Sequence, residues 1–451
     1  MRTVAAVSTP RGKGGVAMVR ITGENAIPIA DLVASRPNGV GLPETESAHA
    51  VRTLFHANGE AFDDGMTTVF RAPRSFTGED TVEFVCHGGP LVTQKLLTAV
   101  FAAGAFPAGP GEFTRRAFQN GKISLSQAEA VGGLIDAKTE RHLQVSLLQC
   151  RGALTKKLNE VHDSLTRLIA SVYAFIDYPD ADMTDVSVED MKTELKRILS
   201  ELDALCGSRA YGKAISEGVR TVIVGKPNTG KSALLNMLAG EDLAIVTEEA
   251  GTTRDVIRQQ ILLGGFLLNL ADTAGLRESE NRIETIGIGK SLSELSEAEL
   301  VLAVFDGSEP LDEEDELVLR RISEAGKESV AVCVMNKSDL GIKAEPPLPE
   351  SVSFSALTGE GRDRLEEAVR NRLSLAEPSD YGEIITNARQ FAALEKAKTH
   401  VERALGTLDG YTQDIAGLDL EQALAALEEA DGRSVSEAVV GEIFSHFCVG
   451  K

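Results

Sequence analysis

The sequence predicts an α/β protein joined to an all-α part, and three observations lead to this fold class. Residues 1–118 alternate short strand-like runs with turn signals. Residues 219–374 alternate strands with helices, which is typical of a mostly parallel sheet. On both sides of that second region, apolar residues recur at three- and four-residue spacing, as they do along helices. The expected domain boundaries are 1–118, 119–216, 217–375 and 376–451.

In the N-terminal region, strands are expected where β-branched and aromatic residues cluster between turn residues. These runs are Val16–Ile21, Thr67–Phe70 and Thr81–Val85, and a helix is expected over Gln94–Ala102. No stretch of this region resembles a nucleotide-binding loop. The pattern therefore predicts an α+β domain and leaves its ligand open.

Helical periodicity begins near Ile123 and returns after the strand–helix region. The expected helices are Leu125–Ala137, His142–Phe175, Met191–Leu205, Asn387–Leu408, Leu420–Glu429 and Ser434–Phe444. The expected connections are an acidic loop at Tyr178–Asp190, a link at Gly207–Gly218 and a linker at Leu373–Glu383. Because the helical stretches flank residues 217–375, we expect them to form one discontinuous bundle with that region inserted.

The inserted region has six expected strands. They are Val219–Val224, Val256–Leu263, Phe266–Ala271, Leu300–Phe305, Ser329–Met335 and Ser351–Phe354. Gly264-Gly265, between the second and the third, predicts a tight hairpin turn.

The stretch Gly225–Ser232, GKPNTGKS, fits the phosphate-binding pattern G-x-x-x-x-G-K-[ST] and lies between an expected strand and an expected helix. Glycines allow backbone N–H groups to surround a phosphate, and a helix N-terminus adds partial positive charge. Lys231 is expected to reach the β- and γ-phosphates, and the Ser232 hydroxyl to ligate Mg²⁺. The expected nucleotide contacts here are Asn228, Thr229, Gly230, Lys231, Ser232 and Ala233.

Four more motifs follow in order. Gly251-Thr252-Thr253-Arg254-Asp255 is a polar loop in which a threonine is suited to Mg²⁺ and the γ-phosphate. In Asp272-Thr273-Ala274-Gly275, Asp272 is expected to hold Mg²⁺ through water, and the Gly275 N–H to contact the γ-phosphate. The last two motifs are Asn336-Lys337-Ser338-Asp339 and Ser355-Ala356-Leu357.

The last two motifs select the base. The Asp339 carboxylate can accept hydrogen bonds from N1–H and the exocyclic amine of guanine, and a backbone N–H in Ser355–Leu357 can donate to guanine O6. Adenine offers neither donor, and an unpaired buried acceptor costs about 1–3 kcal/mol. All five motifs on alternating strands predict a Ras-like P-loop GTPase domain that binds GTP.

Leu276 stands where small signalling GTPases have a glutamine that orients the attacking water. Leucine cannot polarise water, so either hydrolysis is slow or another group takes this role. From the residues alone, Glu284 is one candidate for this group. The alternative is that Glu284 is an ordinary surface glutamate exposed to solvent.

Composition limits the other possibilities. The net charge of −22 argues against non-specific nucleic-acid binding, which needs a basic surface, but it does not exclude RNA on a local patch. No apolar run approaches the roughly 18 residues of a membrane span, and the N-terminus lacks a secretory signal. The cysteines show no metal-ligand spacing and suggest reduced thiols of a cytoplasmic protein. They are Cys86, Cys150, Cys206, Cys333 and Cys448.

Taken together, these motifs resemble the MnmE (TrmE) family of GTPases that modify uridine 34 of tRNA. The resemblance covers essentially the whole chain. Outside the GTPase motifs it rests on Ser75–Asp80, His87–Pro90, Pro110–Phe113 with Arg116–Phe118, Gln127–Ala130 and the ending Phe447–Lys451.

The resemblance implies ligands that the residues alone do not reveal. The N-terminal domain would dimerise and bind 5-formyl- or 5,10-methylene-tetrahydrofolate through Arg20, Glu83 and Lys122. Cys448 would lie in the modification site near the folate; from the sequence alone it is equally well a buried thiol.

The resemblance also implies how the GTPase domain is activated. Potassium-dependent dimerisation of the GTPase domains would replace an activating protein, and Glu284 would be the general base that orients water. The implied K⁺ ligands are Asn228, Thr247, Glu249 and Thr252, and Thr253 would join Ser232 on Mg²⁺.

The implied function is an enzymatic one. With a flavoprotein partner, MnmG, a homodimer would add an aminomethyl or carboxymethylaminomethyl group at C5 of the wobble uridine, and GTP hydrolysis would time that chemistry. Two alternatives stay open: a ribosome-assembly GTPase, and a folate-dependent transferase whose GTPase domain is dispensable. The cysteine fourth from the end is not read as a prenylation site, because Gly450 and Lys451 do not suit that signal.

Overall fold

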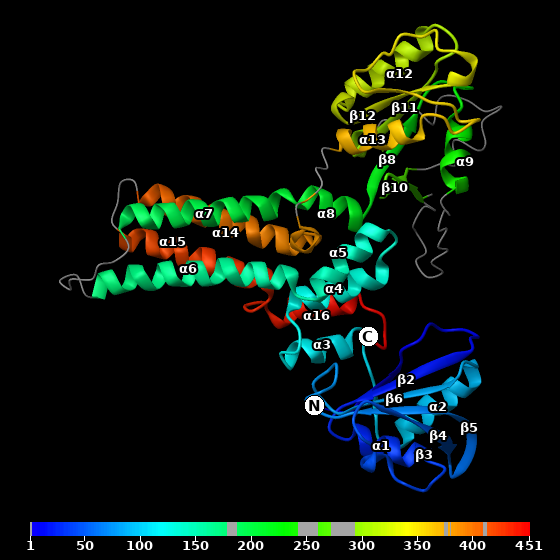
Figure 1. The fold of residues 1–451 in the computed structure, drawn as a ribbon, viewed down its shortest axis with the longest axis vertical. Coiled ribbons are helices and arrows are strands. Elements are labelled where there is room, and N and C mark those ends of the chain that lie inside the picture. Colours follow the sequence, from blue (N-terminus) through cyan, green and yellow to red (C-terminus); the bar gives the residue numbers. More distant parts are fainter. Residues whose placement is uncertain are drawn as a thin grey trace. The chain divides into compact units, whose positions relative to one another are not determined.

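The computed structural model describes residues 2–177, 187–241, 260–271, 294–373, 378, 380–408 and 413–451 (Figure 1). The chain separates into two compact units. Unit 1 comprises Met1–Gly132, Gln149–His162 and Leu424–Lys451, and unit 2 comprises Gly133–Leu148 and Asp163–Ala423. Among the described residues, no helix is both long enough and apolar enough to cross a membrane.

Unit 1 contains a seven-stranded sheet in the order β3-β4-β5-β6-β2-β1-β7. Its strands are β1 (Val4–Val7), β2 (Val16–Thr22), β3 (Ala34–Ser35), β4 (His49–Ala57), β5 (Glu60–Phe70), β6 (Thr81–His87) and β7 (Phe106–Pro107). All neighbours pair antiparallel except β1 and β7. Helices α1 (Ala26–Val33) and α2 (Pro90–Ala102) pack on the sheet around the buried side chains Phe55, Phe84 and Leu96.

The three strands and the helix expected in this region are confirmed, and each is longer than predicted. The largest difference is β5, which begins at Glu60 instead of Thr67. Its first half contains Asp63, Asp64 and Gly65, residue types that disfavour strands. Pairing with β4, itself not predicted, overrides that preference.

Unit 1 also contains α3 (Glu112–Gln119), α16 (Glu437–Ser445) and the first part of α4 (Leu125–Asp136), together with parts of two longer helices at 153–162 and 424–431. Leu125 of α4 and Phe444 of α16 are buried in one apolar cluster. The last residues of the sequence return to the N-terminal region, where Val449 forms an antiparallel bridge with Pro110. Unit 1 is therefore built from both ends of the chain.

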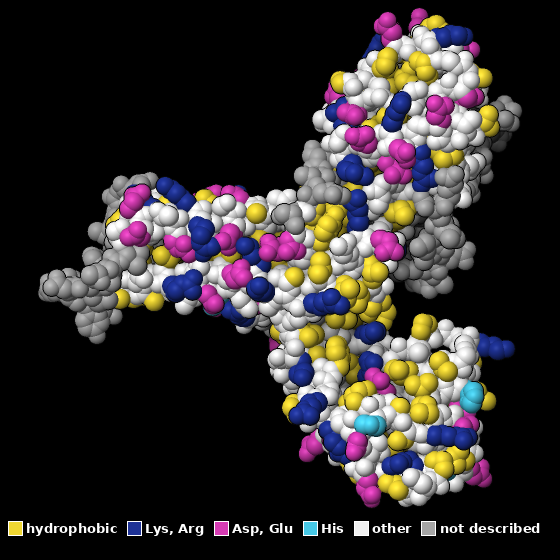
Figure 2. All heavy atoms as spheres, in the orientation of Figure 1, with side chains coloured by type: hydrophobic (Ala, Val, Ile, Leu, Met, Phe, Trp, Pro, Cys, Tyr) yellow, Lys and Arg dark blue, Asp and Glu magenta, His cyan; other side chains and the backbone are white. Residues whose placement is uncertain are grey.

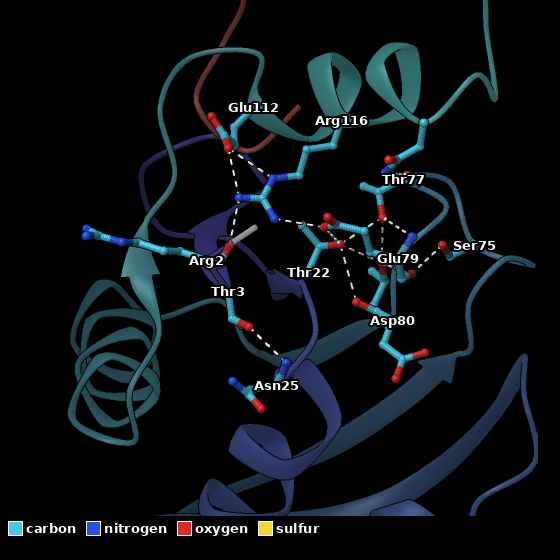
Figure 3. Close-up of polar contacts among 12 residues, drawn as sticks. Arg2, Thr3, Thr22, Asn25, Ser75, Thr77, Glu79, Asp80, Glu112 and Arg116 are labelled. Carbon is cyan, nitrogen blue, oxygen red and sulfur yellow. Dashed lines mark hydrogen bonds and ion pairs between the residues drawn. The ribbon is translucent and has the colours of Figure 1, made fainter.

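A buried arginine joins α3 to the segment before β6 (Figure 3). Arg116 is 3% exposed and forms ion pairs with Glu79 at 2.8 Å and Glu112 at 2.9 Å. It also donates to the backbone oxygen of Arg2 at 2.9 Å. Removing one partner of a buried ion pair leaves the other charge unpaired, so this contact is expected to matter for stability.

We expect Arg116→Met to lower the free energy of unfolding of unit 1 by about 3 kcal/mol, because Glu79 and Glu112 lose their shared cation. Hydrogen exchange of the β2 and β6 amides in the full chain measures this. Arg52→Met is the matched control, since its ion pair with Asp64 is largely exposed and worth at most about 1 kcal/mol. Equal protection in both variants would show that the buried network is not stabilising.

Unit 2 contains a six-stranded sheet in the order β13-β12-β11-β8-β10-β9. Its strands are β8 (Val219–Val224), β9 (Gln260–Leu263), β10 (Phe266–Leu270), β11 (Leu300–Asp306), β12 (Ala331–Asn336) and β13 (Ser351–Ser353). All pairs are parallel except β9 with β10. Within the described residues, the helices of this region are α9 (Lys231–Glu241), α12 (Glu313–Glu324) and α13 (Arg362–Arg372).

The predicted strands and the predominance of parallel pairing are confirmed within the described residues; residues 256–259 of the second strand lie outside them. The hairpin at Gly264-Gly265 is also confirmed, and both glycines have positive φ, 60° and 84°. Two consecutive residues of positive φ match the twist of the flanking strands and favour glycine. The fifth strand begins at Ala331 instead of Ser329, after a short 3₁₀ turn.

The helical part of the chain contains α5 (Glu140–Cys150), α6 (Ala153–Asp177), α7 (Val188–Gly207), α8 (Arg209–Ser216), α14 (Ala388–Thr407) and α15 (Gln413–Asp431). Within unit 2, α7 and α14 lie side by side although the whole sheet separates them in the sequence (Figure 1). Lys398 of α14 pairs with Asp203 of α7 at 2.7 Å. This packing supports the predicted discontinuous bundle.

Three helical predictions are wrong in detail. The single helix expected over His142–Phe175 is two helices, because Gly152, with φ of 88°, ends the first of them. The expected link at Gly207–Gly218 contains α8, and Gly212 within it lets the backbone approach Ile385 closely. Helix α7 begins at Val188, inside the expected acidic loop, because Ser187 caps it.

Candidate functional site

The phosphate loop follows β8, and two of its glycines are required by close contacts. A Cβ at Gly225 would lie 2.2 Å from the backbone oxygen of Val304, and one at Gly230 would lie 2.1 Å from Nδ2 of Asn336. Both glycines also have positive φ, 152° and 92°. The loop is thus held against β11 and against the last residue of β12, as the strand–loop–helix prediction required.

Lys231, the first residue of α9, lies over this loop. Its Nζ donates to the backbone oxygens of Gly225 at 2.8 Å and Lys226 at 2.6 Å. Burial lowers the pKa of Lys231, since it disfavours the charged form. Asn228, Ser232 and Ala233 are exposed beside it. An ammonium group and exposed loop atoms at a helix N-terminus are suited to phosphates.

Asn336 connects the phosphate loop to the two base-selecting motifs. Its Nδ2 donates to the backbone oxygen of Thr229 at 2.8 Å, and its Oδ1 accepts from the Ala356 N–H at 2.9 Å. Asp339 accepts a hydrogen bond from the Ser355 hydroxyl at 2.6 Å. Asn336 is 2% exposed, so these three loops form one assembly at the carboxyl ends of parallel strands.

Lys337 adopts a left-handed conformation with φ of 63°, and its Nζ forms an ion pair with Asp306 at the end of β11. Burial acts to raise the pKa of Asp306, but hydrogen bonds from Lys337 and Ser308 outweigh it and lower that pKa. Asp306 was not predicted as part of the site; its place at the end of an apolar strand was the available signal. Leu357 is 85% exposed.

The remaining predicted GTP and cation ligands lie outside the described residues. They are Thr247, Glu249, Thr252, Thr253, Asp272, Thr273, Ala274, Gly275 and Glu284. Of the predicted cation ligands that are described, Ser232 and Asn228 offer an exposed hydroxyl and an exposed amide, groups with the oxygen atoms that Mg²⁺ and K⁺ take. These two groups agree in type with the predicted Mg²⁺ and K⁺ ligands, and the rest of each predicted donor set lies outside the described residues.

Two of the three predicted folate ligands lie together in unit 1. Arg20 of β2 and Glu83 of β6 are opposite each other in the sheet and form an ion pair at 2.7 Å. The Arg20 guanidinium also lies 5.5 Å from the centre of the Phe113 ring. Lys122 instead donates to the backbone oxygen of Pro73 at 2.9 Å. It borders a cavity of about 300 Å³ lined also by Ser124, Thr155 and Arg433, among others.

Cys448 is exposed, whereas the four other cysteines are buried or half-buried. Its backbone oxygen accepts a hydrogen bond from the Gly111 N–H at 3.3 Å. The backbone oxygen of Gly450 accepts hydrogen bonds from the Ser8 hydroxyl at 3.0 Å and from Arg20 at 3.4 Å. The alternative expectation for Cys448, a buried thiol, is therefore wrong. The anchors of this tail were not predicted, because they lie more than 300 positions away in the sequence.

The parallel sheet, the glycine-constrained loop and the linked base-selecting motifs define a P-loop nucleotide-binding domain of the GTPase class. The family can now be assigned by comparison with known proteins. The MnmE helical domain matches residues 125–448, and the GTP-binding protein TrmE N-terminus matches residues 3–122.

Proteins called tRNA modification GTPase MnmE match along the whole chain. That of Thermotoga petrophila is 41% identical over 461 residues, covering 100% of both chains. That of Geobacillus kaustophilus is 40% identical over 466 residues, covering 100% of this chain and 99% of its own. The chain therefore belongs to the MnmE family of tRNA modification GTPases, and its enzyme class is GTP hydrolase. The resemblance seen in the sequence is confirmed.

Proposed function

We propose that this enzyme hydrolyses GTP to time a modification at C5 of the wobble uridine of tRNA. The observation that carries the proposal is the linked assembly of phosphate loop and base-selecting motifs in a chain that matches MnmE proteins over its full length. The group added is carboxymethylaminomethyl or aminomethyl, and a homodimer acts with the flavoprotein MnmG. The same proposal assigns residues 1–118 to a folate-binding and dimerising domain and residues 217–375 to the GTPase domain. Residues 119–216 and 376–451 are the two parts of the helical domain.

The nucleotide is bound by its phosphates and its base separately. Lys231 exchanges its two backbone acceptors for phosphate oxygens, which places its charge where negative charge grows during hydrolysis. Asp339 binds the guanine edge while Ser355 orients its carboxylate. Ser232 and Thr253 would hold Mg²⁺, which neutralises phosphate charge when bound. Asn228, Thr247, Glu249 and Thr252 would hold K⁺ at the dimer of GTPase domains.

Glu284 is proposed as the general base, because Leu276 cannot orient water. We expect Glu284→Ala to lower the hydrolysis rate at saturating GTP by at least about 100-fold while GTP still binds. Single-turnover hydrolysis and nucleotide binding measure the two effects. Glu278→Ala, a neighbouring carboxylate, is the control. Retained turnover in Glu284→Ala would remove this residue from the mechanism.

The one-carbon unit is proposed to come from tetrahydrofolate bound near Arg20, Glu83 and Lys122. Two contacts of Arg20 support this proposal. Arg20 pairs with Glu83 and also donates to the backbone oxygen of Gly450, so it connects the candidate folate ligands with the segment that contains Cys448. Arg20 would orient the ligand, and the exposed Cys448 thiol stands within the same segment. A folate present at this place would supply the carbon that is transferred.

Nucleoside analysis of tRNA tests the function. A strain that lacks the gene should lose the wobble-uridine modification, and the wild-type gene should restore it. Unaltered wobble uridines in the deletion strain would overturn the proposal and favour a ribosome-assembly GTPase. Modification restored by a Lys231→Ala variant would favour the transferase with a dispensable GTPase domain.

A further inference from the structure

Lys226, a variable position of the phosphate loop, makes two ion pairs that the GTPase motifs do not require. Its Nζ lies 2.7 Å from Asp312 and 2.8 Å from Asp315. The side chain is 15% exposed. Burial acts to lower the pKa of Lys226, but the hydrogen bonds with the two carboxylates outweigh it and raise that pKa. Of the two partners, the side chain of Asp315 is 2% exposed and that of Asp312 is 56% exposed, so the contact with Asp315 is the one shielded from solvent.

The two carboxylates lie at the start of α12, where Asp312 is the N-cap residue and Asp315 the third residue of the helix, and together they form a capping box. Asp312 accepts from the Asp315 N–H at 3.1 Å, and Asp315 accepts from the Asp312 N–H at 3.2 Å. Asp315 is 1% exposed, and its Oδ1 has no hydrogen-bond partner among the described residues. Burying a carboxylate that is only partly hydrogen-bonded is costly, and the ion pair with Lys226 offsets part of that cost.

The backbone of Lys226 contacts two other residues of the phosphate loop. Its carbonyl oxygen accepts from the Lys231 Nζ at 2.6 Å and from the Thr229 hydroxyl at 3.1 Å. Lys226 is thus fixed through its side chain to α12 and fixes, through its backbone, the lysine that is to bind phosphate. A change at the α12 end is transmitted to Lys231 through one residue.

We propose that Lys226, Asp312 and Asp315 form a positioning clamp that holds the phosphate loop in its nucleotide-binding shape before GTP arrives. The inference rests on the proposed binding of GTP at this loop. A loop already in the bound conformation loses less conformational freedom on binding, and this increases affinity without new contacts to the ligand. The three residues touch no substrate and act through Lys231 and the loop backbone.

This role predicts a particular pattern of effects. GTP and GDP share the phosphates that the loop surrounds, so loosening the clamp weakens both by a similar factor. Guanine selectivity is unchanged, because Asp339 lies in a different loop and is held by Ser355. The rate at saturating GTP is also unchanged, since the bound loop regains its shape. A general loss of folding would lower the active fraction instead and leave the affinity of the remaining protein intact.

The test uses the full chain and fluorescent GTP and GDP. We expect Lys226→Met to raise both dissociation constants about tenfold, and Lys226→Arg to restore most of the affinity. The double variant Asp312→Asn with Asp315→Asn keeps the capping oxygens and removes both charges, and it turns the Asp312 oxygen that faces Lys226 into an NH2 group, which cannot accept from Nζ. It should raise both dissociation constants by the same factor as Lys226→Met. The triple variant should raise them no further, because all three residues act as one unit.

Glu316→Gln is the matched control, since Glu316 pairs with Arg320 on the exposed side of the same helix. Unchanged affinities in Lys226→Met, or additive losses in the triple variant, would overturn the clamp. A wild-type protein that binds no GTP would instead overturn the proposed function. The two failures are therefore separated by the wild-type measurement.

Discussion

Lys231→Ala is expected to weaken GTP binding by at least about 100-fold and to abolish hydrolysis. The ammonium group already lies within the phosphate loop, on the oxygens of Gly225 and Lys226, and bound phosphate would be its natural partner. A half-buried cation beside phosphate is partly shielded from water, so its charge is worth more there than in bulk water. Equilibrium titration with fluorescent GTP, followed by a turnover assay, measures both effects.

Lys327→Ala provides the control for this change. Lys327 also belongs to unit 2, and its Nζ also donates to a backbone oxygen, that of Ala298 at 2.9 Å. Its loss should leave nucleotide affinity within about twofold, because it lies outside the proposed site. Comparable weakening in both variants would mean that the effect is one of folding and not of phosphate binding.

Asp339→Asn is expected to exchange guanine for xanthine as the preferred base. Asparagine loses the carboxylate that accepts from N1–H and the exocyclic amine of guanine, and gains an amide that donates to the C2 oxygen of xanthine. It keeps an oxygen for the Ser355 hydroxyl, so the loop should retain its shape. We expect GTP affinity to fall about 100-fold and xanthosine triphosphate affinity to rise correspondingly, since sites built on hydrogen bonds discriminate strongly.

Competition between the two nucleotides for one fluorescent probe measures the exchange. Asp363→Asn, an exposed aspartate in the first turn of α13, is the control and should show the wild-type preference. If Asp339→Asn bound GTP as the wild type does, Asp339 would not contact the base. The binding of GTP would then have to rest on other residues.

The GTPase domain could be predicted well because its signals are local. A strand, a glycine-rich loop and a helix adjoin one another at Val219–Glu241, and each base-selecting motif follows its own strand. The positive φ angles at Gly264 and Gly265 show the same principle, since two adjacent residues determine the turn. Where neighbours in sequence determine the geometry, the sequence pattern was sufficient to predict the structure.

Contacts distant in sequence were not predictable in this way. In the sequence Arg116 was identified only as part of a family motif, and only the fold reveals that Glu79 and the backbone of Arg2 surround it. The break at Gly152 was hidden because apolar spacing continues on both sides of it. Arg20 and Glu83 were identified through the family resemblance, and their ion pair depends on the pairing of β2 with β6. The Mg²⁺ and K⁺ ligands in residues 242–259 and 272–293 stay predictions.

The tail contact has a consequence for how the protein is made. Ser8 and Gly450 are 442 positions apart, yet they are joined by a hydrogen bond in unit 1. The ribosome synthesises the chain from its N-terminus, and early domains generally fold first. In the N-terminal region, Gly111 and Ser8 therefore lack these acceptors until Cys448 and Gly450 have been translated. A nascent chain that stalls before Cys448 would therefore lack both contacts that the tail makes with the N-terminal region.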